Sequence, residues 1–257
     1  MPEIHPTSIV SKEAQIADDV VIGPFCIVEG DVKIDSGTKL LSHVVIYNGA
    51  RIGKNNKIFP GAVIAAVPQD LKFNNEYTEV FIGDNNTIRE AVTISRATAA
   101  TKKTVVGSNC LLMAYVHIAH DCVVGDNCIL ANSVQLAGHV HVEDYVIIGG
   151  LTGVHQFTTI GQHSMIGACS KIVKDIPPYT LFSGNPIMYE GLNRIGLKRR
   201  GFSSDAINSL KEAYNILYSP FYNTSQALEK IKAEVKQTQE VKNLLDFIEK
   251  SQRGISK

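Results

Sequence analysis

The chain has 257 residues, enough for one large domain or for a domain with an appendage. Its 25 Lys and Arg balance its 25 Asp and Glu, so the composition does not support a protein that binds nucleic acid or an anionic membrane through bulk charge. The first residues show no basic segment followed by an apolar run, and no stretch approaches the length of an apolar span, so we expect neither a signal peptide nor a membrane span. Five cysteines without a Cys-x-x-Cys pair then favour a reduced, cytoplasmic protein.

Most of the chain follows a repeat of six residues. Steps of six from Ile4 to Ile172 give 29 positions, and 26 of them are Val, Ile or Leu. A second column, four residues later, holds small or β-branched residues and four of the five cysteines, which we interpret as packing residues. A period of six suits neither an α-helix nor a plain alternating strand, but it is typical of a parallel β-helix built from short strands and turns. Residues 1–185 are therefore predicted to form an all-β solenoid.

Two details of this solenoid can be predicted further. Glycine often follows the inward aliphatic residue, which we interpret as a turn that needs backbone freedom; the positions are Gly23, Gly53, Gly83, Gly107, Gly125, Gly149, Gly161 and Gly167. Residues 65–81 and 96–105 interrupt the repeat and are predicted to form external loops, where binding groups tend to lie. For the second loop, a tolerated surface insertion is an equally good interpretation.

The repeat ends after Pro177-Pro178, and residues 186–257 are predicted to form a small helical domain. Ser203 or Ser204 can cap a helix with one apolar face, a second helix is expected from about Thr224, and a third over about 240–251. Packed against the prism, these helices would cover an exposed coil edge.

Residues 18 apart stack in neighbouring coils, with backbones about 4.8 Å apart. His120 therefore lies next to Gly138, and Asp121 lies next to His139. His120 is off the inward column, so its ring should face outward beside a carboxylate and an amide that no side chain shields. These groups can activate a hydroxyl and hold an oxyanion. The alternative is a β-helix that merely displays histidines on its surface.

A metal site is another interpretation of the histidines. His117, His139 and His141 could supply zinc ligands between subunits. No carboxylate clearly completes a hydrated zinc site, so our preferred expectation is that no metal and no cofactor takes part.

A set of short motifs points to one family. HIAHDC (117–122), LAGHV (136–140), IGG (148–150), VHQF (154–157), GLKRRGF (196–202) and QDLK (69–72) resemble the acyl-ACP–UDP-N-acetylglucosamine O-acyltransferases, which open the lipid A pathway. The resemblance implies a left-handed β-helix, a homotrimer, and active sites between adjacent subunits. It also implies that the 3-hydroxyl of UDP-N-acetylglucosamine attacks the thioester of an (R)-3-hydroxyacyl group on acyl carrier protein, without a cofactor.

The resemblance also implies roles for individual residues. His120 would be the general base, Asp121 its orienting partner, and the Gly138 amide the oxyanion donor. Substrate-binding residues would be Asp70 and Lys72 for the sugar and phosphate, His117, His139, His155 and Gln156 for the sugar and acyl clefts, and Asn193, Arg199 and Arg200 for the UDP portion. Ala168 would set the depth of the acyl groove. The sequence departs from the family at Ile195, where an acidic residue is usual, and at Pro186, where a histidine is usual.

Three other classes of protein stay open. An acetyl-CoA-dependent hexapeptide acetyltransferase would share the solenoid and a histidine base. A zinc-dependent hydratase would use the histidine cluster for metal. A structural or ice-binding β-helix would show flat ranks of Thr-x-Thr, which this chain lacks on its histidine-rich surface. A covalent acyl-enzyme is not expected, because a thioester is already activated and the cysteines are accounted for by packing.

Overall fold

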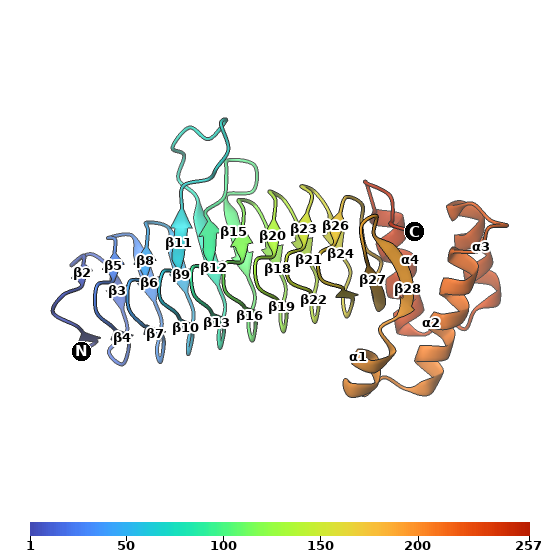
Figure 1. Ribbon diagram of the computed structural model, residues 1–257, viewed down its shortest axis with the longest axis horizontal. Coiled ribbons are helices and arrows are strands. Elements are labelled where there is room, and N and C mark those ends of the chain that lie inside the picture. The colour runs from blue at the N-terminus through green and yellow to red at the C-terminus, as the bar shows by residue number, and fades with distance from the viewer.

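The computed structural model describes residues 1–257 as a long triangular prism that ends in four helices (Figure 1). Each coil of the prism contains three short strands, and the strands of neighbouring coils pair in parallel. His117 pairs with Gln135 and Val123 pairs with His141, so the predicted spacing of 18 residues is confirmed. The chain is a left-handed parallel β-helix with a small helical C-terminal part.

The three faces of the prism are three sheets. The first face has 11 strands: β1 (Glu3–Ile4), β4 (Val21–Ile22), β7 (Lys39–Leu40), β10 (Lys57–Ile58), β13 (Thr87–Ile88), β16 (Leu111–Leu112), β19 (Ile129–Leu130), β22 (Ile147–Ile148), β25 (Met165–Ile166), β27 (Thr180–Ser183) and β28 (Met188–Leu192). The second face has nine: β2 (Ile9–Val10), β5 (Ile27–Val28), β8 (Val45–Ile46), β11 (Val63–Ala66), β14 (Thr93–Ser95), β17 (His117–Ile118), β20 (Gln135–Leu136), β23 (Gly153–Val154) and β26 (Lys171–Ile172). The third face has eight: β3 (Gln15–Ile16), β6 (Val32–Ile34), β9 (Ala50–Ile52), β12 (Glu79–Ile82), β15 (Lys103–Val106), β18 (Val123–Val124), β21 (His141–Val142) and β24 (Thr159–Ile160).

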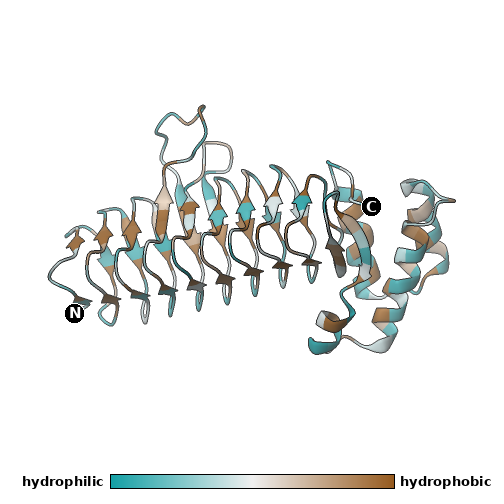
Figure 2. Ribbon diagram, in the orientation of Figure 1, coloured by the Kyte–Doolittle hydropathy of each residue, from teal (hydrophilic) through white to brown (hydrophobic).

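The predicted aliphatic column forms the core of the prism. A cluster of 43 buried residues runs along its axis, and it includes Ile46, Ile118 and Ile148, none of which is exposed to solvent. Four cysteines of the second column are buried in the same core, as expected. Figure 2 shows the hydrophobic strands repeating from coil to coil. Because every coil covers the hydrogen-bonding edge of its neighbour, burial continues over the length of the prism.

The glycines that follow the inward aliphatic residue were predicted to supply backbone freedom at turns, and this interpretation is wrong. None of the glycines that follow the inward aliphatic residue has a positive φ; instead, a Cβ at Gly23 would lie 2.3 Å from the backbone oxygen of Leu41 in the next coil. These positions exclude side chains because two backbones approach closely. The left-handed backbone positions are occupied by other residues, among them Asp121 and His139, both with φ of 61°.

Two loops leave the edge where the second face turns into the third, which we call the second–third edge. The first loop covers residues 67–78, between β11 and β12, and the second loop covers residues 96–102, between β14 and β15. Both rise from the same part of the prism (Figure 1). They are slightly shorter than predicted because the flanking strands extend into both segments.

The C-terminal part consists of α1 (Arg194–Arg199), α2 (Ser204–Leu217), α3 (Thr224–Glu234) and α4 (Gln239–Lys250). Ser203 caps α2, as one of the two predicted residues. The helices share a second core of 16 buried residues, and Asn243 on α4 donates a hydrogen bond to the Tyr179 hydroxyl of the last coil at 2.9 Å. β28 pairs antiparallel with β27, so this hairpin spans the predicted boundary between the solenoid and the helical domain at residues 185 and 186. The boundary itself stays a prediction.

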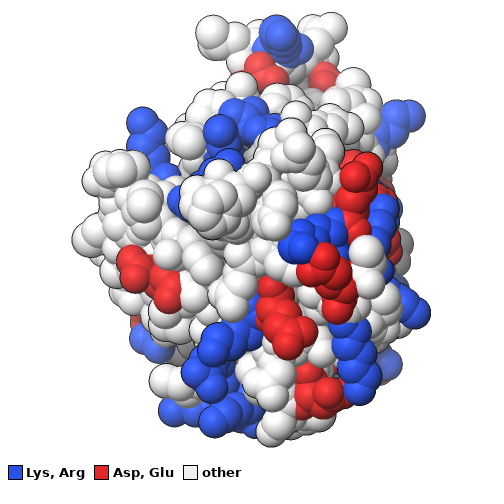
Figure 3. Space-filling model, turned by 90° about the vertical axis from the view of Figure 1, so that its right-hand side faces the viewer, with Lys and Arg blue, Asp and Glu red and all other residues white.

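The helices are too short or too polar to cross a bilayer. Figure 3 looks onto the helical end of the molecule and shows acidic and basic side chains next to one another on its lower right part, beside a larger area that is mostly uncharged. This pattern agrees with the balanced charge of the whole chain.

Candidate active site

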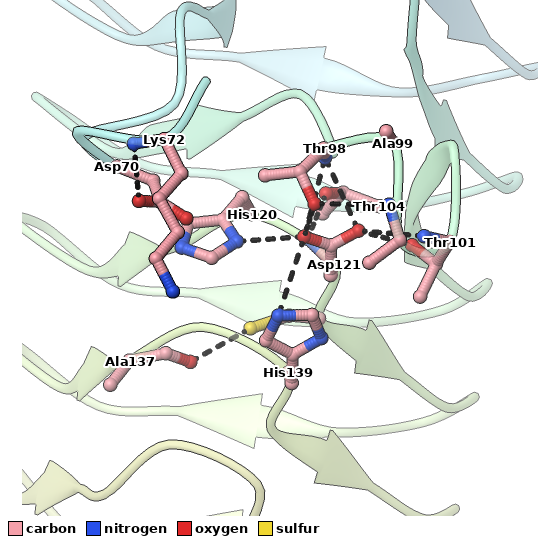
Figure 4. A network of polar contacts seen from close by, with 12 residues as sticks. Asp70, Lys72, Thr98, Ala99, Thr101, Thr104, His120, Asp121, Ala137 and His139 are labelled. Atoms are coloured by element: carbon pink, nitrogen blue, oxygen red, sulfur yellow. Dashed lines mark hydrogen bonds and ion pairs between the residues drawn. The ribbon is translucent and has the colours of Figure 1, made fainter. Parts of the chain in front are cut away.

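The histidine cluster lies on the second–third edge, below the two loops (Figure 4). His120 and Asp121 occupy the turn between β17 and β18, and Gly138 and His139 occupy the equivalent turn one coil further on. The stacking is direct, because the His139 N–H donates a hydrogen bond to the His120 carbonyl at 3.1 Å. The prediction that these residues stack is therefore confirmed.

His120 and Asp121 form a hydrogen-bonded pair. His120 Nδ1 lies 2.7 Å from Asp121 Oδ2, and the His120 side chain is 15% exposed whereas that of Asp121 is 0% exposed. An ionised carboxylate can only accept hydrogen bonds, so Nδ1 of His120 carries the hydrogen of this bond. Nε2 of the neutral ring then keeps its lone pair. The arrangement leaves one basic nitrogen available on the outer side of the pair.

The second loop holds the Asp121 carboxylate from the other side. The Thr98 amide lies 3.2 Å from both carboxylate oxygens, the Thr98 hydroxyl donates to Oδ2 at 2.8 Å, and the amide and hydroxyl of Thr101 donate to Oδ1. Burial alone would raise the pKa of Asp121, but the bonds from Thr101, His120 and Thr98 outweigh it and hold the pKa below its usual value. The second loop is therefore part of the site rather than a bare surface insertion.

Gly138 is required by the position of the His120 ring. A Cβ at Gly138 would lie 2.5 Å from Cε1 and 2.7 Å from Nε2 of that ring, so only glycine fits without a displacement. The Gly138 N–H makes no hydrogen bond within the chain. A free amide thus stands beside the basic nitrogen of His120, where a developing oxyanion could accept from it.

Two hollows meet at His120. A groove of about 570 Å³ follows the second face and is lined by His117, Gly138, His155 and Gln156 among others. A second hollow of about 750 Å³ opens toward the loops, and its lining includes Asp70, Lys72 and His139. His120, Gln156 and Gln69 border both. The predicted sugar, phosphate and acyl residues of this edge are therefore brought together around one imidazole.

The other histidines of the edge are held in defined orientations. His117 Nδ1 lies 2.7 Å from the Thr93 hydroxyl, and burial followed by the nearby His120 lowers the pKa of His117. His139 stacks on Phe157 with ring centres 4.5 Å apart and meets His120 edge to face at 5.3 Å. His155 Nδ1 donates to the Gln156 carbonyl at 3.1 Å. His117 and His155 therefore each keep one ring nitrogen for a substrate, whereas Nε2 of His139 lies 3.7 Å from Asp121 Oδ2.

The predicted nucleotide residues lie on a different edge of the same prism. Arg200 donates to the Tyr145 carbonyl at 3.1 Å, where the third face turns into the first, and its guanidinium lies 5.2 Å from the Tyr145 ring centre. Asn193 is buried, caps α1 and donates to the His163 carbonyl at 2.9 Å. Arg199 is exposed. One chain does not bring these three residues to His120.

Three further residues of the sequence analysis lie apart from the His120 groove. Ala168 is exposed on the edge between the first and second faces and lines neither hollow at His120. Ile195 is an exposed residue of α1, and Pro186 lies in the turn between β27 and β28. Their roles toward a substrate stay predictions.

The histidines considered as zinc ligands between subunits, His117, His139 and His141, do not meet within one chain. His141 belongs to β21 on the third face, whereas His117 belongs to β17 on the second face. The residues whose ligand atoms lie within 4.8 Å of one another are His120, Asp121 and His139, in which the carboxylate is already surrounded by donors from the second loop.

Sequence reasoning missed the residues that support the histidines. Thr98 and Thr101 hold Asp121, and Thr93 holds His117. The only available signal was the high content of threonine in the second loop, which by itself does not distinguish a carboxylate clamp from a polar surface turn.

Comparisons with known proteins agree on one family. A family model described as Udp N-acetylglucosamine O-acyltransferase, domain 2, matches residues 175–256, and the bacterial transferase hexapeptide model matches residues 13–48 and 103–138. The chain is 51% identical over 99% of both chains to an acyl-[acyl-carrier-protein]–UDP-N-acetylglucosamine O-acyltransferase of Thermodesulfovibrio yellowstonii. It is 46% identical, again over 99% of both chains, to the enzyme of the same name from Thiobacillus denitrificans. A crystal structure of a UDP-N-acetylglucosamine acyltransferase from Bacteroides fragilis superposes with a TM-score of 0.97 at 46% identity, covering 99% of this chain and 100% of that one.

Proposed function

The chain belongs to the acyl-ACP–UDP-N-acetylglucosamine O-acyltransferase family, and from that premise we propose its reaction in detail. It moves an (R)-3-hydroxyacyl group from acyl carrier protein to the 3-hydroxyl of UDP-N-acetylglucosamine, the first step of lipid A biosynthesis. The observation that carries the residue assignments is the hydrogen-bonded His120–Asp121 pair beside the free Gly138 amide, at the junction of two hollows.

His120 acts as the general base. Its Nδ1 hydrogen is engaged by Asp121, so Nε2 takes the proton from the 3-hydroxyl as the hydroxyl oxygen attacks the thioester carbonyl. Asp121 fixes the tautomer and the ring orientation, and its negative charge stabilises the imidazolium that forms.

The Gly138 amide receives the negative charge that develops on the carbonyl oxygen. When the tetrahedral intermediate collapses, the ester bond is kept and the carbon–sulfur bond breaks. The leaving thiolate takes the proton from His120, so the products are the O-acylated sugar nucleotide and the free thiol of the carrier protein. No covalent acyl-enzyme is needed, since the thioester is already an activated donor.

The two hollows divide the substrates between them. Asp70 and Lys72 face the loop-side hollow, where they contact the sugar and the phosphate side of the nucleotide, and His139 lines the same hollow. The groove of the second face, with His117, His155 and Gln156, takes the acyl chain and part of the sugar. His120 is placed between the hydroxyl and the thioester because it borders both hollows.

A homotrimer completes the site. The nucleotide-binding residues Asn193, Arg199 and Arg200 lie near an edge other than that of His120, so α1 of a neighbouring copy supplies them. A cyclic assembly of three triangular prisms places unlike edges of adjacent copies in contact, which this arrangement requires. Ala168 reaches the acyl groove by the same packing. A cytoplasmic location belongs to this proposal and is supported by five cysteines without a disulfide.

Mass spectrometry of products tests the proposed function. The purified chain is incubated with UDP-N-acetylglucosamine and a mixture of (R)-3-hydroxyacyl carrier proteins, and in parallel with acetyl-CoA. We expect one O-acylated sugar nucleotide from the carrier-protein reaction. Product from acetyl-CoA alone would instead favour the acetyltransferase, and loss of turnover after chelation would favour the zinc hydratase; the comparisons favour neither class.

A further inference from the structure

The first loop is fastened to the second loop by one carboxylate. Glu76 Oε1, in the first loop, accepts a hydrogen bond from the Ala99 amide of the second loop at 3.0 Å. The other oxygen of the same carboxylate accepts from the Asn74 amide at 2.7 Å. Glu76 thereby joins a turn of the first loop to the outer end of the second.

A cation supports this junction. Arg96, at the start of the second loop, donates its backbone N–H to the Ala66 carbonyl at 2.9 Å, and its guanidinium lies 5.5 Å from the ring centre of Phe73 in the first loop. Arg96 Nε is buried and has no hydrogen-bond partner in the chain. The pKa of Glu76 is held below its usual value by its own backbone amide, against burial, and further by the amides of Asn74 and Ala99 and the charge of Arg96. The carboxylate therefore stays ionised and able to accept both bonds.

The two loops carry different parts of the site. The first loop holds Asp70 and Lys72 at the loop-side hollow, and the second loop holds the Asp121 carboxylate through Thr98 and Thr101. Ala99, which binds Glu76, is the direct chain neighbour of Thr98 (Figure 4). A displacement of the first loop therefore moves Ala99 and, one residue away, Thr98, which holds the Asp121 carboxylate.

We infer that Glu76 is a positioning residue for the acyl transfer: it fastens the loop that binds the sugar nucleotide to the loop that clamps Asp121, so that acceptor and base keep one arrangement. The inference rests on the proposed function. Glu76 contacts neither the reacting atoms nor His120; it acts through Ala99 and Thr98. Since a misplacement of about 1 Å can cost on the order of 100-fold in rate, a partial release of the second loop should cost about ten-fold.

Three variants of the full-length chain separate positioning from loss of charge. Glu76→Ala removes both acceptor oxygens, whereas Glu76→Gln keeps one oxygen for the Ala99 amide. Glu13→Ala is the matched control, because Glu13 lines the hollow beneath the first loop with Glu76 but bonds to neither loop. We expect kcat to fall about ten-fold in Glu76→Ala, to stay within about three-fold of wild type in Glu76→Gln, and to be unchanged in Glu13→Ala. Thermal melting of each variant verifies that the fold is kept.

A double variant gives a readout that a purely structural role would not move. If Glu76 acts through the second loop, its loss should matter less once Thr101→Val has already loosened Asp121. The combined loss in kcat should then be smaller than the product of the single losses by at least about three-fold. Losses that multiply, or a Glu76→Ala variant with wild-type kcat, would overturn the inference. A wild-type chain that fails to acylate UDP-N-acetylglucosamine would overturn the proposed function instead, and this inference with it.

Discussion

Replacing Gly138 by alanine tests the geometry of the base most locally. The new Cβ would lie 2.5 Å from His120 Cε1, whereas ordinary van der Waals contact begins near 3.4 Å, so the ring or the turn must move by about 1 Å. Such a displacement takes Nε2 out of line with the acceptor hydroxyl and moves the Gly138 amide away from the oxyanion. Since either effect is on the order of 100-fold, we expect kcat of Gly138→Ala to fall by at least about 100-fold.

The assay is the steady-state rate with saturating UDP-N-acetylglucosamine and carrier-protein thioester, together with a melting curve. Gly30→Ala is the matched control, because Gly30 occupies the same place in its hexad on the same edge, and its Cβ would meet side-chain atoms alone: the flexible end of Glu13 at 2.7 Å and the Ser11 hydroxyl at 3.3 Å. It should keep the wild-type rate. A folded Gly138→Ala variant with a rate within a few-fold of wild type would refute the close fit of the ring against this glycine.

Three other predictions address pH, acyl length and assembly. Burial, and then the charge of Arg200, lower the pKa of His163 to about 4, so the folded chain binds fewer protons than the unfolded chain below pH 6.5. The free energy of unfolding should therefore fall by up to about 2 kcal/mol per chain from pH 6.5 to 5. Denaturant unfolding of the His163→Gln variant should lack this fall. Ala168→Met should shorten the preferred acyl chain, and an unchanged preference in competition between carrier proteins of different acyl length would count against that role. An equimolar mixture of His120→Ala and Arg199→Ala chains that assembles at random should recover about a quarter of the wild-type rate, because about one interface in four then joins two intact halves. No recovery would contradict a site shared between copies.

The prism could be predicted from the sequence because the residue pattern that specifies it recurs in almost every hexad. A buried aliphatic residue at every sixth position, as at Ile118, Val124 and Leu130, admits few other folds, and the 18-residue stacking of His120 on Gly138 follows from it. The close approach of coils at Gly23 did not follow, since it depends on how far one backbone lies from the next rather than on any local turn.

The supports of the site could not be predicted in the same way. The clamp of Thr98 and Thr101 on Asp121 spans about 20 residues and depends on the path of a loop that breaks the repeat. The separation of Arg200 from His120 follows from which edge α1 packs against, and a single sequence does not encode that choice in any periodic pattern. Both depend on tertiary contacts that the hexads do not specify.

Replacing His120 by alanine tests the central claim most directly. The ring lies outside the prism core, so the variant should keep its melting temperature and its assembled mass. Because a positioned general base contributes about 100- to 10,000-fold, we expect turnover of UDP-N-acetylglucosamine to fall by at least about 100-fold. A correctly assembled variant that acylates the sugar nucleotide at the wild-type rate would contradict the assignment of this imidazole as the base.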